Sequence, residues 1–328
     1  AAGSMSLSEF EIIDQYFTPL GHWQGPHTVV GPGDDCAVLS PPPDHQLCVS
    51  SDTFIEGVHF PVGAGGALAA RRTLAGAVSD LAAMGSEPLA VTGALTLVTA
   101  DPDWLGSFSR ALSELIQDWQ LPLVGGNISR GSELSLTWTV IGSVPTGSYV
   151  TRGGASAGED IYISGWPGRA GCALSKLQSG QQPPEQLAKH YLAPVPRLLL
   201  GQHLRGLASA LIDVSDGLLA DLNHLLDGSA LGARLNAQDM AFDELLQANT
   251  DSPAAALTYF LTAGDDYELC FIAPVSARSE IDRLALKLAL PLNRIGETKA
   301  ELGLQFANLP EALTESMLIK ATGYRHFT

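Results

Sequence analysis

Eight of the chain's 20 aspartates lie in five short motifs rich in glycine and serine, and these motifs constrain the fold more than any other feature. Two carboxylates about 4 Å apart repel each other by roughly 4 kcal/mol at an effective dielectric constant near 20. Several aspartates brought together stay ionised only beside cations, and Mg²⁺ held by a few aspartates and substrate phosphates is the usual arrangement. The five motifs are Gly33-Asp34-Asp35, Ser50-Ser51-Asp52-Thr53, Val78-Ser79-Asp80-Leu81, Asp213-Val214-Ser215-Asp216-Gly217 and Gly264-Asp265-Asp266-Tyr267-Glu268.

Each motif taken alone also has an ordinary structural explanation. Gly-Asp-Asp is a common turn, and Asp216 before Gly217 is a good helix N-cap. Four of the five motifs adjoin the end of a predicted strand. Asp80 differs, because it interrupts a predicted helix of Ala, Leu and Met residues, where an unpaired buried carboxylate is costly.

Charge and composition exclude several classes of protein. The 328 residues include 18 Lys and Arg against 35 Asp and Glu, so the net charge is 18 − 35 = −17. Such an acidic surface repels nucleic-acid backbones and anionic membranes. The hydrophobic fraction of 45% is that of a folded protein. No apolar run approaches the ~20 residues that span a bilayer, no secretory signal is recognisable and no Cys-x-x-Cys spacing occurs. These features predict a cytoplasmic protein.

The order of the predicted elements indicates a mixed α/β fold in two domains. Alternating, β-branched runs at 89–98 and 134–144 predict strands, and the pattern predicts helices at 66–84 and 103–119. Residues 145–159 are dense in Gly, Ser and Thr, which is typical of a boundary. We therefore expect an N-terminal domain at 5–147, with metal and ATP motifs and the dimer contact, and a C-terminal domain at 148–328 that completes the ATP and substrate site.

A phosphate-bearing partner is indicated by the segment from Leu123 to Gly131. Here an apolar strand is predicted to end in two glycines, which lets backbone amides approach a phosphate closely. Arg152, in the glycine-rich boundary, is a second candidate for binding a phosphate. Walker A, dinucleotide and protein-kinase signatures are absent from the sequence. A nucleotide would therefore be bound through carboxylates and Mg²⁺.

The motifs in this order resemble those of the thiamine-monophosphate kinase family, part of the superfamily of aminoimidazole ribonucleotide synthetase. The resemblance extends from about Phe10 to Phe327. It rests on the segments GDDCAVL, SSDTFIEGVHF, VSDLAAMG, LVGGNISRG, TRGGASAGE, IDVSDGL, AGDDYELCF and GYRHF. It implies ATP-dependent phosphorylation of thiamine monophosphate to thiamine diphosphate, with release of ADP. It also implies several Mg²⁺ ions and a homodimer in which the N-terminal sheets form a barrel.

The resemblance further implies roles for individual residues. The implied Mg²⁺ ligands are Asp35, Ser50, Ser51, Asp52, Asp80, Asn127, Asp213 and Asp216. The implied ATP contacts are Gly126, Asn127, Arg152 and Ser215, and the implied thiamine-monophosphate contacts are His59, Asp265 and Tyr324. No catalytic side chain beyond these ligands is expected, because a phosphate oxygen of the acceptor is nucleophilic at neutral pH, and we expect direct in-line transfer without a phosphoenzyme.

Two positions depart from the family pattern. Asn127 stands where many relatives have Asp, which removes one negative charge from an implied metal site, and Asp265 stands where Glu is frequent. Two alternatives stay open at this point. One is another ATP-dependent enzyme of the superfamily, similar to selenophosphate synthetase or to aminoimidazole ribonucleotide synthetase. The other is a non-catalytic module that binds divalent cations.

Overall fold

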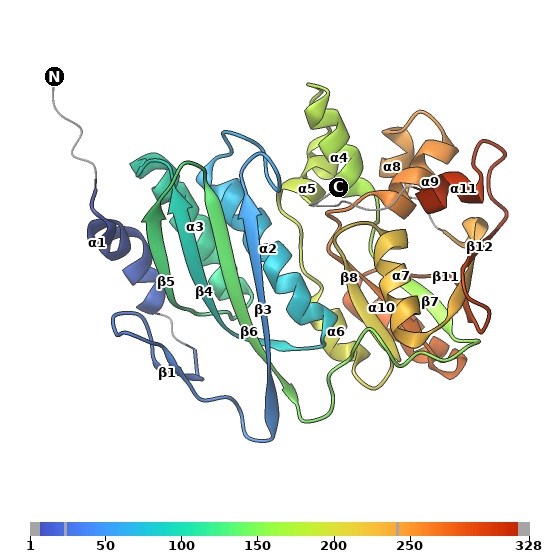
Figure 1. Cartoon of the computed structure of the whole chain (residues 1–328), viewed down its shortest axis with the longest axis horizontal. Coiled ribbons are helices and arrows are strands. Elements are labelled where there is room, and N and C mark those ends of the chain that lie inside the picture. The colour runs from blue at the N-terminus through green and yellow to red at the C-terminus, as the bar shows by residue number, and fades with distance from the viewer. Residues whose placement is uncertain (1–6, 23–24, 241–242, 321–328) are drawn as a thin grey trace. The chain divides into compact units, whose positions relative to one another are not determined.

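The chain folds into two compact units, each with its own sheet (Figure 1). The computed structural model describes residues 7–22, 25–240 and 243–320. The first unit comprises Ala1–Leu81 and Ser86–Gly147, and the second comprises Ala82–Gly85 and Ser148–Thr328. Helices and strands alternate in both, so the predicted mixed α/β class is confirmed. The distribution of metal, ATP and substrate binding between two domains stays a prediction.

The first unit is built on a four-stranded sheet. Its order is β3 (His45–Ile55), β6 (Ser135–Pro145), β4 (Glu87–Leu97) and β5 (Leu123–Arg130). The pairs β3–β6 and β6–β4 are antiparallel, and β4–β5 is parallel. The remaining elements of this unit are α1 (Glu9–Ile12), a π-helical turn (Ile13–Phe17), a 3₁₀ turn (Thr18–His22), β1 (Thr28–Val30), β2 (Val38–Leu39), α2 (Gly66–Ala83) and α3 (Pro102–Asp118).

Helices α2 and α3 cover one face of this sheet (Figure 1). Trp138 of β6 is fully buried there, and its indole Nε1 donates to Thr73 Oγ1 of α2 at 2.8 Å. The same ring stacks on Phe108 of α3 with centroids 6.2 Å apart. Both helices lie within one residue of their predicted ranges, because the apolar positions that produced those predictions are the ones that contact the sheet.

The opposite face of the sheet, here called the open face, carries Leu47, Val49, Ser51, Thr137 and Thr139. Ser51 Oγ and Thr139 Oγ1 lie 3.0 Å apart across β3 and β6. Leu47 is 50% exposed and Val49 is 64% exposed. Strands β3 and β5 form the two edges, so the sheet does not close into a barrel within this chain. The expected barrel, formed by the sheets of two subunits, stays a prediction.

The second unit is built on a six-stranded sheet. Its order is β12 (Leu304–Ala307), β9 (Gly232–Asn236), β11 (Leu292–Lys299), β7 (Asp160–Ser164), β10 (Glu268–Ala273) and β8 (Ala210–Val214). All neighbours are antiparallel except β12 and β9. Its helices are α4 (Arg169–Gln178), α5 (Glu185–Leu192), α6 (Leu198–Leu204), α7 (Leu218–Ser229), α8 (Glu244–Ala248), α9 (Pro253–Thr262), α10 (Arg278–Leu288) and α11 (Glu315–Lys320), with 3₁₀ turns at Ala237–Asp239 and Val275–Ala277.

Strands β7, β8 and β10 are buried at every residue, which means that both faces of the sheet are covered. One core cluster joins α7 and α9 to these strands, and a second, smaller cluster joins α4, α5, α8 and α9. Within the part of the chain that the structure describes, no helix combines the length and the apolar character needed to cross a membrane.

A buried ion pair fixes the start of β10. Glu268 is 2% exposed and accepts hydrogen bonds from Arg197 Nε at 2.7 Å and from Ser164 Oγ at 2.6 Å. Burial acts to raise the pKa of Glu268, but the Arg197 guanidinium outweighs it and the pKa lies below its ordinary value. The carboxylate is therefore ionised, and removing it leaves a buried guanidinium without its counter-charge.

We predict that Glu268→Gln lowers the free energy of unfolding by about 3–5 kcal/mol, because a buried charge loses its partner. Urea denaturation followed by circular dichroism measures the loss. Glu280→Gln is the matched control, since Glu280 and Arg283 form an exposed pair, with side chains 51% and 71% exposed, and such pairs contribute about 0–1 kcal/mol. Equal effects of the two variants would contradict the prediction.

Candidate active site

In the first unit the structure brings Ser50, Asp52 and Asp80 together. Ser50 and Asp52 are alternate residues of β3 and so point to the same side, toward α2, which carries Asp80. The Ser50 hydroxyl donates a hydrogen bond to Asp80 Oδ2. Burial first, and then the charge and a hydrogen bond of Asp80, raise the pKa of Asp52 to about 6. This is the electrostatic signature of carboxylates placed where a cation would offset their charge.

The strand that carries these residues is longer than the sequence predicts. The sequence places the Ser50-Ser51-Asp52-Thr53 motif at the end of a predicted strand, whereas β3 continues through Ser51 and Asp52 to Ile55 and pairs with β6 along all eleven of its residues. Because side chains alternate, Ser51 lies on the open face, with its hydroxyl 3.0 Å from that of Thr139. The side chains of the two implied serine ligands thus point to opposite faces of the sheet.

The glycine-rich segment after Val124 is also strand, which corrects the expected end of the strand at two glycines. Strand β5 continues through Gly125 and Gly126 to Arg130 in parallel register with β4. A Cβ atom at Gly126 would lie 2.0 Å from the carbonyl oxygen of Gly93. This glycine therefore permits the close approach of two strands, while Asn127 next to it is exposed.

The register across the sheet keeps two sets of implied ligands apart. Asp52 pairs with Trp138, Trp138 with Gly93, and Gly93 with Gly126. Asp52 and Gly126 are thus in one row at opposite edges, roughly 14 Å apart at ~4.8 Å per strand spacing. That separation exceeds what the ligands of one Mg²⁺ ion can cover. Within one chain this sheet cannot bring Asn127 to the same ion as Ser51 and Asp52.

Asp34 and Asp35 lie in the exposed segment before β2. The Asp34 side chain accepts a hydrogen bond from the Asp35 N–H at 2.9 Å, the local geometry expected of an Asp turn. Over residues 7–22, 25–240 and 243–320, no three His, Cys, Asp or Glu side chains form a group that could hold a metal ion.

His59 is held rigidly just beyond β3. Its Nδ1 accepts a hydrogen bond from the Ile55 N–H at 2.9 Å, and its ring meets Phe54 edge-on. The buried Arg72 of α2 donates from Nε to the His59 carbonyl at 2.7 Å. Since Nδ1 is an acceptor, the neutral ring carries its proton on Nε2, which gives His59 a donor suited to a phosphate oxygen.

In the second unit two loops carry the implied ligands, and they are bonded to each other. Asp213 is the penultimate residue of β8, and Ser215 and Asp216 lie in the turn before α7. The Asp265 N–H donates to the Ser215 carbonyl at 2.8 Å. A Cβ atom at Gly264 would lie 2.4 Å from the same carbonyl oxygen, so only glycine fits there. This one backbone hydrogen bond therefore positions Ser215, an implied ATP contact, relative to Asp265, an implied contact of thiamine monophosphate.

Two buried or partly buried aspartates that sequence reasoning did not single out hold these loops. Asp221 of α7 accepts the N–H groups of Ser215 at 3.0 Å and Asp216 at 3.1 Å. Burial raises the pKa of Asp221 to about 7. Asp266 accepts the N–H of Gly168 at 2.8 Å, and burial raises its pKa well above the ordinary value. The sequence feature that could have pointed to Asp221 is its position four residues after Gly217. The feature that could have pointed to Asp266 is the pair of adjacent aspartates at 265–266.

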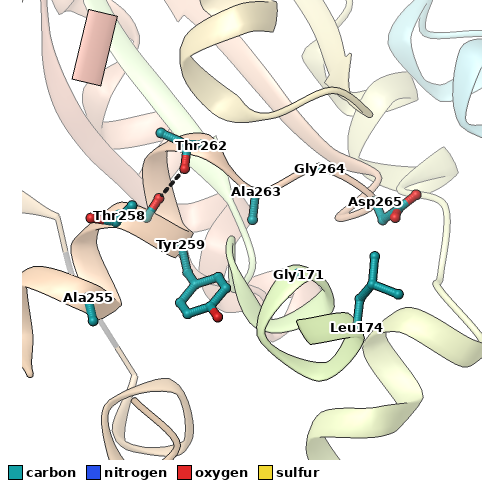
Figure 2. Close-up of a pocket in the computed structure, with 9 residues that line it drawn as sticks. All are labelled: Gly171, Leu174, Ala255, Thr258, Tyr259, Thr262, Ala263, Gly264 and Asp265. Carbon is teal, nitrogen blue, oxygen red and sulfur yellow. Dashed lines mark hydrogen bonds between the residues drawn. The ribbon is translucent and has the colours of Figure 1, made fainter. Parts of the chain in front are cut away.

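A cavity of about 590 Å³ opens beside Asp265 (Figure 2). Its walls come from α4, α9 and the segment that joins α9 to β10. Figure 2 shows the Tyr259 ring and Leu174 at its sides, with Asp265 at one end. The lining residues are Gly171, Leu174, Ala255, Thr258, Tyr259, Thr262, Ala263, Gly264 and Asp265. A largely apolar cavity with one carboxylate and a tyrosine suits an aromatic ligand that bears a positive charge.

Of the implied contacts that the structure describes, Arg152 is not brought into these groups. Arg152 is exposed in the segment before β7. Tyr324 lies outside the described residues.

Comparison with known proteins identifies the class of protein that this fold and these carboxylate motifs define. Residues 33–144 match the family model described as AIR synthase related protein, N-terminal domain. The thiamine-monophosphate kinase of Escherichia coli strain K12 is 39% identical, over 98% of this chain and 99% of its own length. A crystal structure of the thiamine-monophosphate kinase from Stenotrophomonas maltophilia K279a is 38% identical, covers 92% of this chain and 97% of its own, and superimposes with a TM-score of 0.84.

A further solved structure, AaThiL complexed with AMPPCP and TMP, shares the fold with a TM-score of 0.74. It is 23% identical and covers 88% of this chain and 89% of its own. Residues 33–144 therefore carry the N-terminal domain of AIR synthase-related proteins. Within that class, the chain belongs to the thiamine-monophosphate kinase family.

The raised pKa of Asp52 leads to a prediction for the metal-free protein. The pKa rises from 3.8 to about 6 on folding. Ionisation of Asp52 therefore opposes folding, and its cost grows as the pH rises from about 4 to about 6. We predict that Asp52→Asn, in chelator, leaves the melting temperature unchanged near pH 4 and raises it by about 2–4 °C at pH 7.5, which corresponds to roughly 1 kcal/mol after solvent screening.

Differential scanning calorimetry of the wild type and the variant across this pH range measures the effect, and the difference between the curves isolates Asp52 from other carboxyl groups. Asp118→Asn, at an exposed position of α3, is the matched substitution with which the Asp52→Asn difference is compared. A difference curve for Asp52→Asn that is flat between pH 4 and 7.5 would contradict the prediction.

Proposed function

We propose that this protein transfers the γ-phosphoryl group of ATP to thiamine monophosphate, giving thiamine diphosphate and ADP. The observation that carries the proposal is the 39% identity to a thiamine-monophosphate kinase over nearly the whole of both chains. The partly buried Asp52–Asp80 pair and the cavity beside Asp265 supply the two chemical needs of this reaction, a place for cations and a place for a thiamine ring. A cytoplasmic location, where ATP is abundant, accords with this activity.

The residues present fit Mg²⁺ by the chemistry of their donors. Asp52 and Asp80 offer hard carboxylate oxygens, and the raised pKa of Asp52 reflects a charge that a cation would stabilise. The residues proposed to hold Mg²⁺ are Asp35, Ser50, Ser51, Asp52, Asp80, Asn127, Asp213 and Asp216. When bound, Mg²⁺ offsets the negative charge of the phosphates.

The chain's own residues then have separate tasks. We assign ATP binding to Gly126, Asn127, Arg152 and Ser215, with the Arg152 guanidinium donating to phosphate oxygens. His59 donates from Nε2 to the phosphate of thiamine monophosphate, and Asp265 faces the cationic or amino side of the thiamine rings. Tyr324 is assigned to stack on a ring.

The proposed reaction is a direct in-line transfer. An oxygen of the acceptor phosphate forms the new bond to the γ-phosphorus as the bond to the bridging oxygen of ADP breaks. No side chain needs to accept a proton before attack, because the acceptor phosphate is already anionic. The protein's contribution is to hold two anionic substrates in line, and Asp52 and Asp80 are the carboxylates whose position this requires.

We predict that Asp80→Asn and Asp52→Asn each reduce turnover by about 100-fold or more, because each removes charge and an oxygen ligand from the proposed metal site. Phosphorus NMR of the protein with Mg-ATP and thiamine monophosphate identifies the products, and only the proposed kinase yields thiamine diphosphate together with ADP. Asp118→Asn, on the exposed end of α3, is the control and should retain wild-type turnover. Near-normal turnover in both Asp80→Asn and Asp52→Asn would refute the assignment.

We further propose that the protein is a homodimer in which two four-stranded sheets form a barrel with the open faces inside. Two observations support this. Leu47 and Val49 are exposed on the open face beside a row of hydroxyl groups. Asn127 and Asp52 lie at opposite edges of one sheet. A partner's β5 beside β3 would remove both exposed edges and bring Asn127 of the partner subunit toward Asp52.

We predict that the wild type sediments as a dimer at micromolar concentration and that Val49→Glu sediments as a ~34 kDa monomer, because a carboxylate is placed in an apolar contact. Leu286→Glu is the control, since Leu286 is 83% exposed on α10 of the other unit. Sedimentation velocity separates the two species. A wild type that is only monomeric would refute the dimer.

A further inference from the structure

The segment between α9 and β10 adopts a backbone that does not form without outside support. Asp265 has φ of +68° and Tyr267 has φ of +50°, so two residues with side chains are left-handed on either side of Asp266. This conformation is disfavoured for residues that carry a Cβ atom, because the Cβ lies too close to the following carbonyl oxygen. Contacts elsewhere must therefore hold this segment, and they determine where the Asp265 carboxylate lies.

One set of contacts comes from the turn before α7. The Tyr267 N–H donates to the Val214 carbonyl at 2.8 Å, and the Asp265 N–H donates to the Ser215 carbonyl at 2.8 Å. These bonds fix the backbone on both sides of Asp266. They do not by themselves fix the helix that faces Asp265 across the cavity.

The second set is made by the Asp266 side chain. Its Oδ2 accepts the N–H of Gly168 at 2.8 Å, and the carboxylate also accepts the N–H of Ala170. Gly168 is the N-cap residue of α4 and Ala170 lies in its first turn, and the N–H groups at this end have no partner within the helix. Asp266 thus ties the start of α4 to the loop that carries Asp265.

Helix α4 packs closely against its neighbours near these hydrogen bonds. A Cβ atom at Gly168 would lie 2.7 Å from the backbone nitrogen of Phe260 in α9. One turn further along α4, a Cβ atom at Gly171 would lie 2.3 Å from the Cβ of Ala263. Helices α4 and α9 and the loop are therefore packed too closely for a Cβ atom at Gly168 or Gly171. The Asp266 side chain makes the hydrogen bonds to α4 at this contact.

The same three segments are the walls of the 590 Å³ cavity (Figure 2). We propose that Asp266 is a positioning residue that sets the affinity for thiamine monophosphate, by fixing Asp265 and the α4 wall of this cavity relative to each other. Asp266 does not touch the substrate, because its carboxylate oxygens are directed to α4. The inference rests on the proposed function.

The test compares two variants of Asp266 that differ in the number of side-chain hydrogen-bond acceptors they retain. Asp266→Ala removes both hydrogen bonds to α4, while Asp266→Asn keeps one carbonyl oxygen as an acceptor and leaves one N–H without its partner. We expect Asp266→Ala to raise KM for thiamine monophosphate at least ~10-fold and Asp266→Asn to raise it ~3-fold to 10-fold. KM for ATP should stay within about 3-fold of wild type in both, because Ser215 and Asp216 are held by Asp221.

Isothermal titration calorimetry with thiamine monophosphate alone gives a readout that does not depend on turnover, and the dissociation constant should follow the same order. Ile295→Ala is the matched control. Ile295 is fully buried in β11 of the same sheet, two strands from β10, so it lowers stability without contacting the loop. Its KM for thiamine monophosphate should stay at the wild-type value.

Wild-type activity is measured first. Absence of thiamine diphosphate there refutes the proposed function and not the role of Asp266. With an active wild type, the proposal is overturned if Asp266→Ala binds thiamine monophosphate within 2-fold of wild type. It is also overturned if KM rises equally for both substrates, or if Ile295→Ala raises KM for thiamine monophosphate as much as the Asp266 variants do. Should Asp266→Ala fail to fold, Asp266→Asn alone decides by the same criteria.

Discussion

The site in the second unit depends on the hydrogen bond from the Asp265 N–H to the Ser215 carbonyl. It joins the loop after β8 to the loop before β10, and the lack of space for a Cβ atom at Gly264 shows how closely they lie. Asp221 holds one loop from α7, and Asp266 holds the other against α4. Residues assigned to ATP and to thiamine monophosphate are thereby parts of one rigid assembly, which suits a reaction that requires two phosphates in line.

The acidic residues of this protein serve two different purposes. Burial first, and then the neighbouring Asp80, raise the pKa of Asp52, the arrangement expected of a cation site. Asp221 and Asp266 instead accept backbone N–H groups, and Glu268 is paired with Arg197. The doubled aspartate at 265–266 unites both purposes, since one residue faces the cavity and its neighbour holds a helix. The sequence motif alone cannot assign different roles to Asp265 and Asp266, because both are aspartates.

The four-stranded sheet keeps some of the residues proposed to bind Mg²⁺ apart within one chain. Its register places Asp52 and Gly126 in one row but at opposite edges, with two strands between them. A flat sheet cannot shorten that distance, whereas closure with a second sheet can. The exposed Leu47 and Val49 on the open face accord with such closure. The departure at Asn127 would then alter a site shared by two subunits.

The sequence by itself determined the family, the mixed α/β class, and elements such as α2, α3, β4 and β6. It did not reveal α9, because that helix is apolar nearly all round and shows little helical periodicity. Only the tertiary structure decided that β3 continues through Ser50–Asp52 and β5 through Gly125–Gly126. There, ladder bonds to neighbouring strands outweigh the local turn preference of Gly and Ser. It also decided which aspartate faces a cavity and which faces a helix, because those neighbours come from distant segments of the chain.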